Sequence, residues 1–481
     1  MNYRMMMRVT AQILSIEAAF MLPALFICLL DVDKKASFAF FITIVIILVI
    51  SLVFLTLSKG AKKGFYAREG LVCVGLGWAL MSALGALPFT FSGEIPNYID
   101  ALFETVSGFT TTGSSILSDV EVLSRGILYW RSFTHWIGGM GALVLLLAVL
   151  PKNSGFAMHL LRAESPGPSV DKLVPKMKNS AMILYLIYIA LTFINILFLV
   201  AGKMPLFDAV CTALGTAGTG GFGIKNSSMA GYSPYLQNVT SVFMLLFGIN
   251  FSCFYLILLK QFKSVFRNDE LKFYIGLIAV STALITINIR SLYTTFEETL
   301  RHAFFQVSSI VTTTGFATAD FDLWPSFSKA IILCLMLTGA CAGSTGGGFK
   351  CIRVLLIGKS VTRNIRKLLS PKRVQVVRIN KHSISDDIIS STNTYLSAYL
   401  LIMVISFLLI SLDGFSVTTN LSAVISCLNN IGPGFEAVGP TCNFSGFSVL
   451  SKLVLILNML LGRLEIFPIL VLFSVSTWKH Q

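Results

Sequence analysis

The sequence predicts an all-α integral membrane protein in which four pseudo-symmetric repeats surround a central pore, preceded by two N-terminal transmembrane helices. Two observations support this prediction. Of the 481 residues, 55% are hydrophobic and only 12% are charged, which is about half the charged fraction of a soluble protein. In addition, a segment rich in glycine and threonine recurs four times between apolar stretches. The first observation places the chain in a membrane, and the second indicates a repeat.

Long apolar stretches predict the spanning helices, because about 20 apolar residues cross a bilayer as a helix. They lie at 9–30, 36–58, 67–91, 131–150, 179–201, 236–259, 272–290, 327–357, 389–412 and 449–475. Their even number puts both termini on one side, and the termini with alternate loops hold most of the 37 lysines and arginines. By the positive-inside rule that side is cytoplasmic. The net charge of +14 therefore reflects membrane orientation and not nucleic acid binding.

Each repeated segment follows a half-length apolar stretch that is too short to cross a bilayer. These half helices are expected at 98–108, 205–214, 296–311 and 417–429. The segments after them read VSGFTTTGSS (106–115), LGTAGTGGFG (214–223), SSIVTTTGFAT (308–318) and CLNNIGPGFE (427–436). Alignment on one shared glycine selects Gly113, Gly221, Gly315 and Gly434. The predicted unit is helix, re-entrant pore helix, loop and helix, which divides the chain into 1–60, 61–155, 156–265, 266–375 and 376–481.

Four such loops around one axis suit an alkali cation. Backbone carbonyls at membrane depth are tolerated only inside protein or beside a watery cavity, and rings of carbonyls can replace the hydration shell of a cation. Glycine permits the positive φ that aims successive carbonyls in one direction. The C-terminal ends of half helices favour a cation through their dipoles. The non-cytoplasmic loops also carry acids that would raise the local cation concentration, although ordinary solvated loops are the alternative; among them are Glu104, Asp119, Glu121, Asp320 and Asp322.

A glycine-rich stretch at 338–348 interrupts the second helix of the third repeat. Its five glycines cost roughly 1 kcal/mol each relative to alanine in a helix. We therefore expect a break at membrane depth and a mobile loop that gates the pore, whereas a helix-packing face, the alternative, needs a regular spacing that three consecutive glycines lack. The candidate gating residues in this loop are Gly343, Ser344, Thr345, Gly346, Gly347 and Gly348.

Two polar residues of the predicted helices, Arg463 and His135, need a separate explanation. Arg463 lies in the last helix, where an unpaired charge costs roughly 2.5–3.5 kcal/mol or more. It should face the pore or form a salt bridge with another helix, and Glu465 should point elsewhere because it is only two residues away. His135 is expected to be a hydrogen-bonded structural histidine at the outer end of its helix, with a proton relay as the alternative.

The chain resembles the TrkH/TrkG/KtrB family of potassium transporters along nearly its whole length. Besides the four loops, the similarity is clearest at WRSFTHWIGGMG (130–141), TGACAGSTGGGFKCIR (338–353) and LGRLEIFP (461–468). The two additional N-terminal helices favour the TrkH/TrkG branch. The resemblance implies K⁺ uptake through a selectivity filter in a bacterial inner membrane, by a homodimer with one pore in each subunit. It implies no organic cofactor.

Transferred residue by residue, the family's filter falls on three residues of each loop. The residues are Thr111, Thr112 and Gly113; Thr219, Gly220 and Gly221; Thr313, Thr314 and Gly315; and Ile431, Gly432 and Gly434. The fourth loop lacks threonine, so we expect an uneven filter of moderate selectivity. In the family, the arginine at the position of Arg463 repels cations below the filter while the gate loop is closed.

Residues 350–381 carry ten basic residues and no acid. Such a run beside a membrane contacts anionic lipid headgroups, or, as the resemblance implies, docks a TrkA- or KtrA-like nucleotide-binding ring. The chain has no P-loop and no G-x-G-x-x-G after a strand, so nucleotide control must come from a partner.

Two other classes of function fit the sequence less well. An enzyme acting on lipid-linked substrates needs clustered acids or histidines, but the chain has five histidines and no H-E-x-x-H. A proton- or sodium-coupled symporter needs a midplane carboxylate, and the only acids in the predicted spans are Glu17, Glu69 and Glu465. Transport rather than catalysis is therefore predicted, and ion coupling stays open.

Overall fold

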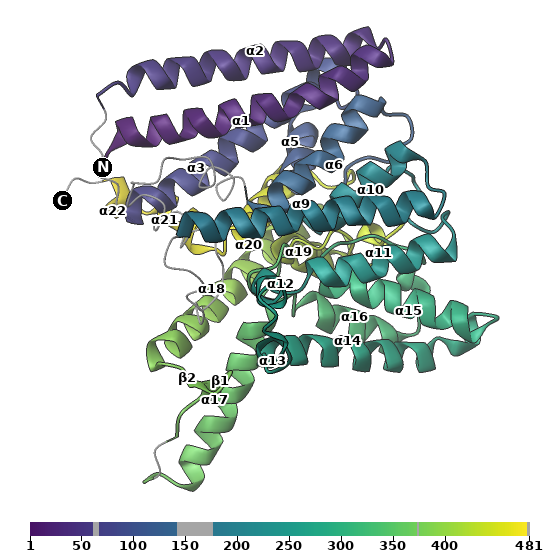
Figure 1. Cartoon of the computed structure of the whole chain (residues 1–481), viewed down its shortest axis with the longest axis vertical. Helices are drawn as coiled ribbons and strands as arrows, with labels where there is room; N and C mark the ends of the chain where they lie inside the picture. Colours follow the sequence, from purple (N-terminus) through teal and green to yellow (C-terminus); the bar gives the residue numbers. More distant parts are fainter. Residues whose placement is uncertain (61–66, 142–176, 373–374, 479–481) are drawn as a thin grey trace.

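The computed structural model describes residues 1–60, 67–141, 177–372 and 375–478. Its first two helices, α1 (Tyr3–Leu30) and α2 (Lys34–Leu57), form an antiparallel pair along one side of the molecule (Figure 1). Asp33 caps α2, because its carboxylate accepts the N–H groups of Lys35 and Ala36 at 3.1 Å each. The two predicted N-terminal helices are therefore present.

The rest of the chain repeats one pattern four times, and each repeat begins with a long helix followed by a pore helix. The long helices are α3 (Ala67–Gly85) with its extension α4 (Leu87–Ser92), α9 (Met177–Ala201), α14 (Asp269–Asn288) and α18 (Asp386–Ile410). The pore helices are α5 (Tyr98–Phe109), α10 (Leu206–Gly218), α15 (Phe296–Val311) and α19 (Val417–Asn429). The predicted half helices are confirmed, and for α15 and α19 the bounds agree to the residue.

Each repeat ends with a second helix, and among the described residues that helix continues after a break in three repeats. The second helices are α6 (Arg125–Met140), α11 (Pro234–Phe247) with α12 (Phe251–Leu258), α16 (Ser326–Met336) with α17 (Cys351–Leu369), and α20 (Val449–Arg463) with α21 (Phe467–Phe473). The predicted break in the third repeat is confirmed, since residues 337–350 separate α16 from α17. Beyond residue 141, the predicted helix at 131–150 lies outside the described residues.

The predictions of uninterrupted helices at 236–259 and 449–475 are wrong. The α11 and α12 axes differ by 89°, because the Tyr274 hydroxyl packs against Gly248 and the Asn250 side chain starts a new helix by accepting the Ser252 N–H at 2.9 Å. After α20, Glu465 and Ile466 both adopt positive φ, of 56° and 67°. Such values end a helix for residues with a side chain.

Short elements complete the fold. The strands β1 (Arg378–Ile379) and β2 (His382–Ser383) form an antiparallel hairpin beside α17, and this part projects from the helical body (Figure 1). The remaining elements are α13 (Phe262–Phe266), α22 (Val475–Trp478), and the 3₁₀ turns Arg290–Leu292, Phe321–Leu323, Ser411–Asp413 and Glu436–Val438.

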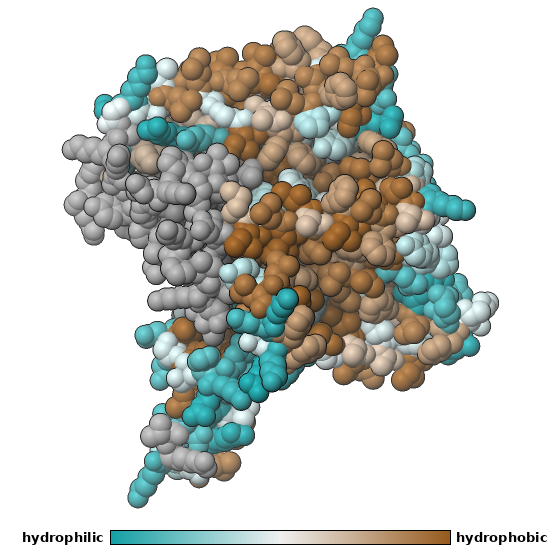
Figure 2. Space-filling model, viewed as in Figure 1, coloured by the Kyte–Doolittle hydropathy of each residue, from teal (hydrophilic) through white to brown (hydrophobic). Residues whose placement is uncertain are grey.

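The surface is that of a multi-pass membrane protein. Among the described residues, six helices are long and apolar enough to cross a membrane, and the bent α11–α12 pair makes a seventh. On α2, Phe38, Phe41 and Leu52 are each more than half exposed. Hydrophobic side chains cover the surface over α2 and α9, whereas hydrophilic ones gather on the α17 projection (Figure 2). A soluble protein would bury such side chains, so these faces are built for lipid.

Candidate cation pathway

The four pore helices all end in the same backbone turn. The first loop residues, Thr111, Thr219, Thr313 and Asn430, have φ values of 55°, 54°, 59° and 54°. Two residues later, φ is again positive, at 82°, 74°, 88° and 104° for Gly113, Gly221, Gly315 and Gly432. The residue between them donates its N–H to a carbonyl five positions back, at 2.8–2.9 Å, in the pairs Thr112–Ser107, Gly220–Gly215, Thr314–Ser309 and Ile431–Ser426. The loops are therefore four copies of one conformation.

The loops close into a ring in chain order, as contacts at the glycines show. A Cβ atom placed on Gly113 would lie 2.1 Å from the Gly220 carbonyl oxygen of the second loop. The same construction gives 1.9 Å from Gly221 to the Thr314 oxygen, 2.2 Å from Gly315 to the Ile431 oxygen, and 2.9 Å from Gly432 to the Thr112 oxygen. Each glycine thus touches the middle carbonyl of the next loop, and the fourth loop returns to the first. No other residue fits these positions.

The alignment that selected Gly434 in the fourth loop is wrong. Gly432 has the positive φ and the contact with the neighbouring loop, whereas a Cβ on Gly434 would meet Val438 and Ser422 of its own repeat. The fourth loop therefore contributes Asn430, Ile431 and Gly432 to the ring. The Gly-Pro-Gly sequence offers two glycines, and the backbone conformation and the ring contact distinguish them.

Side-chain oxygens gather at the end of the ring nearer the pore helices, which we call its inner side. The Oγ1 of Thr111 and the Oδ1 of Asn430 are buried without a hydrogen-bond partner. The Asn430 Nδ2 donates to the Thr112 Oγ1 at 3.0 Å and to the Met459 carbonyl at 2.9 Å. Because a carbonyl can only accept, these bonds fix the orientation of the amide. Its Oδ1 then faces Gly347 and Gly462, where an added Cβ would lie 3.1 and 2.8 Å away.

The segments that follow the loops form a second ring on the opposite side, and we call them the mouth loops (114–124, 222–233, 316–325 and 435–448). Hydrogen bonds join each neighbouring pair of mouth loops. In these bonds Asn226 Nδ2 donates to Asp119 Oδ1 (2.7 Å), Met229 N to Ala317 O (3.0 Å), Glu436 N to Asp322 Oδ2 (2.9 Å) and Phe444 N to Ser115 O (2.8 Å). The pKa of Asp119 is lowered because its carboxylate accepts from the Asn226 side chain and from the Glu121 backbone.

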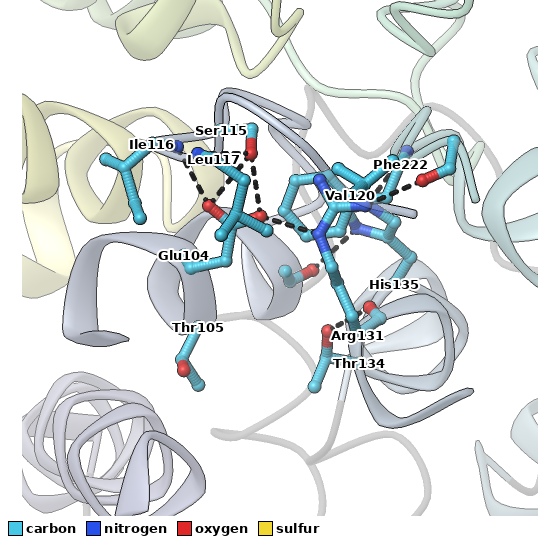
Figure 3. Close-up of polar contacts among 12 residues, drawn as sticks. Glu104, Thr105, Ser115, Ile116, Leu117, Val120, Arg131, Thr134, His135 and Phe222 are labelled. Carbon is cyan, nitrogen blue, oxygen red and sulfur yellow. Dashed lines mark hydrogen bonds and ion pairs between the residues drawn. The ribbon is translucent and has the colours of Figure 1, made fainter. Parts of the chain in front are cut away.

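A buried ion pair supports the first two loops from behind (Figure 3). Arg131 of α6 donates from Nε to Glu104 of α5 at 2.6 Å, and both side chains are at most 3% exposed. The Arg131 Nη1 donates to the Gly223 carbonyl at 2.8 Å, and its guanidinium lies 3.6 Å from the Phe222 ring centroid. Glu104 also accepts the Ile116 N–H at 3.0 Å. Since Glu104 is buried and paired, the expectation that it adds charge to the mouth is wrong.

His135 links the same two repeats. Its Nδ1 lies 2.8 Å from the Gly108 carbonyl, and its Nε2 accepts the Phe222 N–H at 3.3 Å (Figure 3). Because Nε2 accepts a hydrogen bond, the ring hydrogen of His135 lies on Nδ1. The expected hydrogen-bonded histidine is present, but its expected place at the outer end of its helix is wrong, because α6 begins at Arg125. The ring instead lies directly against Gly220.

Residues 337–350, which we call the glycine loop, lie on the inner side of the third and fourth loops. The Gly347 N–H donates to the Thr313 Oγ1 at 2.7 Å. Side chains would not fit there, because a Cβ on Gly346 would lie 2.9 Å from the Thr312 carbonyl and one on Gly347 would lie 2.8 Å from the Asn429 carbonyl. The glycine loop is also held at the α11–α12 bend, where the Phe251 N–H donates to the Gly343 carbonyl at 2.9 Å.

Arg463, the last residue of α20, joins three repeats. Its Nη1 donates to the Thr345 carbonyl of the glycine loop at 2.8 Å, and its Nη2 donates to the Gly138 carbonyl and, at 2.9 Å, to the Gly139 carbonyl of α6. Glu465 does point elsewhere, as predicted: it pairs with Arg353 of α17 at 2.5 Å. The guanidinium therefore lies beside the glycine loop and the end of α6.

Sequence reasoning missed three features of this site. They are Asn430, the Arg131–Glu104 pair and the Arg353–Glu465 pair. A charged residue inside an apolar helix was the available signal for both pairs, because such a charge needs a partner. The sequence could not name the partner, which in each case lies on another helix.

The family model for TrkH, described as a cation transport protein, matches residues 36–288 and 292–479. The Trk system potassium uptake protein TrkH of Salmonella typhimurium is 37% identical over 430 residues, covering 88% of each chain. TrkH of Halomonas elongata is 34% identical over the whole of both chains, and TrkG of Escherichia coli is 34% identical over 95% of each.

The crystal structure of the potassium transporter TrkH from Vibrio parahaemolyticus superimposes with a TM-score of 0.89 at 29% identity, covering all of both chains. The predicted all-α fold and the prediction of a transport protein rather than an enzyme are confirmed by these relatives. This chain belongs to the TrkH family of cation transport proteins.

Proposed function

We propose that this chain is the membrane-spanning subunit of a potassium uptake system, and that K⁺ passes through the ring of four loops. The observation that carries the proposal is the closure of the ring, in which the middle carbonyl of each loop lies against the glycine of the preceding loop. Carbonyl rings of this kind replace the water around K⁺. The names of the relatives, which are Trk system potassium uptake proteins, support the same cargo.

In this proposal the loops form a selectivity filter with three layers of backbone carbonyls. The layers comprise Thr111, Thr219, Thr313 and Asn430; Thr112, Gly220, Thr314 and Ile431; and Gly113, Gly221, Gly315 and Gly432. The unpartnered Asn430 Oδ1 and Thr111 Oγ1 add side-chain oxygens at the inner side. An unsatisfied buried oxygen costs about 1–3 kcal/mol, which a bound cation would offset.

The layer nearest the mouth loops is uneven. The Gly432 carbonyl accepts hydrogen bonds from Ser114 Oγ at 3.0 Å and from Ser426 Oγ at 2.7 Å. Among the described residues, no hydroxyl donates to the carbonyls of Gly113, Gly221 or Gly315. Three oxygens of this layer are therefore free for an ion and the fourth is engaged, which favours moderate discrimination between K⁺ and Na⁺.

The glycine loop and Arg463 form the gate in this proposal. The glycine loop touches the filter through Gly347 and Thr313, and the Arg463 guanidinium lies beside it. A fixed positive charge on the inner side of a cation filter opposes conduction electrostatically. Movement of the loop would be controlled by a cytosolic TrkA-like nucleotide-binding subunit.

We propose a homodimer in a bacterial inner membrane, with both termini cytoplasmic. The end of α17 supports an assembly contact, because Val361, Ile365 and Leu368 recur at helical spacing and are 53%, 53% and 81% exposed. The basic residues of α17 and the hairpin suit anionic lipid headgroups on the same side.

Growth of a potassium-uptake-deficient bacterium at low potassium tests the main proposal. The native chain should restore growth when its regulatory partner is present, and Gly113→Ser or Gly315→Ser should abolish it, because either side chain would strike a neighbouring carbonyl. An equal amount of membrane-inserted variant must be shown by immunoblot. Failure of the native chain to restore growth or to take up ⁸⁶Rb⁺ would refute potassium uptake.

A further inference from the structure

The first helix of the third repeat begins with two consecutive acids that hold two different parts of the molecule. Asp269 and Glu270 are the first residues of α14. Adjacent side chains on a helix point in directions about 100° apart, so the two carboxylates face different neighbours. Asp269 faces the hairpin and α17, whereas Glu270 is 5% exposed and faces the glycine loop.

Asp269 binds the turn of the hairpin reciprocally. Its backbone N–H donates to the Asn380 Oδ1 at 2.8 Å, and its Oδ2 accepts the Asn380 N–H at 3.2 Å. The same Oδ2 accepts from Lys359 Nζ of α17 at 2.9 Å, and Lys359 also donates to the Arg378 carbonyl at 2.8 Å. Asp269 therefore ties the start of α14 to both the hairpin and α17.

Glu270 binds the glycine loop. Its Oε1 accepts the Ala342 N–H at 2.7 Å, and the same carboxylate faces the backbone N–H of Ile352 and the side chain of Asn250. Ala342 lies near the middle of the glycine loop, and Ile352 is the second residue of α17. This one carboxylate therefore fixes the middle of the glycine loop and the start of α17 relative to α14.

The hairpin packs against α17. One apolar cluster joins Ile352 and Leu356 of α17 to Val377, Ile379 and Ile384 around the hairpin, and Ala342 of the glycine loop packs against it. Because α17 follows the glycine loop directly, displacement of the hairpin from α14 pulls on the end of the loop.

We infer that Asp269 and Glu270 form a latch that keeps the glycine loop closed until the hairpin is displaced from the start of α14. The inference rests on the proposed function and adds the route of its regulation. A cytosolic partner that draws the hairpin away breaks the Asp269–Asn380 bonds, moves α17 and withdraws the loop from the Glu270 carboxylate. The input surface is the hairpin turn, and the output is the position of Gly346 and Gly347 at the filter.

Flux measured without any partner tests the latch. The purified chain is reconstituted into liposomes, and ⁸⁶Rb⁺ uptake is compared among the native chain, Asn380→Ala, Glu270→Ala and the double variant. Each single variant should raise partner-independent uptake by about tenfold, the scale expected for a lost hydrogen bond to a carboxylate. The double variant should not multiply the two effects, because both changes open one latch.

Asp386→Asn is the matched control. Asp386 is likewise the first residue of its helix, α18, and pairs with a basic residue of α17, Arg363, at 2.5 Å. It does not reach the glycine loop, so uptake should stay at the native level. Unfolding temperatures in detergent identify any variant whose fold is damaged, and Asn380→Ala changes only a turn outside the helices.

Arg463→Ala separates the two ways in which this test can fail. If Arg463→Ala conducts but Asn380→Ala and Glu270→Ala stay at the native level, the latch is wrong and the proposed pore stands. If the two single effects multiply, the acids do not act through one latch. If no variant and no partner-bound protein takes up the ion, the proposed function itself is wrong.

Discussion

Gly432 occupies a position where conformation and space both demand glycine. Its φ is 104°, and an added Cβ would lie 2.9 Å from the Thr112 carbonyl of the first loop. Gly434, two residues on, donates its N–H to the Val438 carbonyl at 2.6 Å, and an added Cβ would meet the side chains of Val438 and Ser422, both of its own repeat. At the scale of single residues, the ring therefore distinguishes two glycines that look equivalent in the sequence.

This difference predicts distinct outcomes for two alanine substitutions. Gly432→Ala should abolish the preference of uptake for K⁺ over Na⁺, because the strained backbone must shift within the filter. Gly434→Ala should lower stability by about 1–3 kcal/mol, the usual cost of overpacking, and keep the preference. Competition of K⁺ and Na⁺ with ⁸⁶Rb⁺ uptake measures the ion preference of both variants. Loss of selectivity in Gly434→Ala alone would support the alignment that places Gly434 in the filter.

Arg131 and Glu104 illustrate a second residue-scale effect, since a buried ion pair is costly to break. Arg131→Met should lower the free energy of unfolding in detergent by about 3–5 kcal/mol, because Glu104 is left buried without its partner. Arg125→Met is the matched control. The side chains of Arg125 and Asp31 are 56% and 31% exposed, so its loss should cost about 1 kcal/mol or less. Equal losses in the two variants would contradict the support role of Arg131.

At the scale of elements, the second helices were partly predictable. The break at residues 337–350 could be predicted because glycines disfavour helix locally. The bend at Gly248 and the turn at Glu465 and Ile466 could not, since Leu464, Glu465 and Ile466 are acceptable helix residues. Tertiary contacts impose those breaks, namely the Tyr274 hydroxyl against Gly248 and the Arg353–Glu465 pair. The pore helices were predictable because their length and flanking loops are encoded locally.

The proposed gate predicts that uptake changes when Arg463 is replaced. Arg463→Ala removes the donors to the Thr345, Gly138 and Gly139 carbonyls. It also removes the positive charge beside the glycine loop, so uptake without the partner should rise several-fold, by roughly the effect of 1–2 kcal/mol. Arg463→Lys should stay closer to the native rate because the charge remains. Uptake by Arg463→Ala at the native rate, with normal membrane insertion, would rule out a gating role.

At the scale of the whole molecule, four repeats of unequal sequence converge on one ring and a second ring of mouth loops. The repeat was recognisable from the sequence because each unit carries its own loop. The contacts between repeats were not, because partners such as Asn226 and Asp119 or Phe444 and Ser115 lie far apart in the chain. These contacts give each loop a neighbour on both sides.

The proposed homodimer can be tested at the exposed apolar residues of α17. Ile365→Glu with Leu368→Glu would place two charges in the exposed apolar stripe of α17. If that stripe is the assembly contact, the mass measured by light scattering in detergent should fall from two chains to one. Lys367→Glu, which adds an acid to the same turn of α17 outside the stripe, should leave the mass unchanged. A dimer that survives the double substitution places the interface elsewhere.

The four loops belong to a single polypeptide, and this has a consequence for how the pore can vary. In a channel assembled from four identical chains, one codon change alters four positions at once, so the four loops cannot differ in sequence. Here one codon alters one quarter of the ring. Asn430 stands where the other three loops have threonine, so oxygen number and chemistry can be adjusted one loop at a time while the remaining three keep the ion path intact.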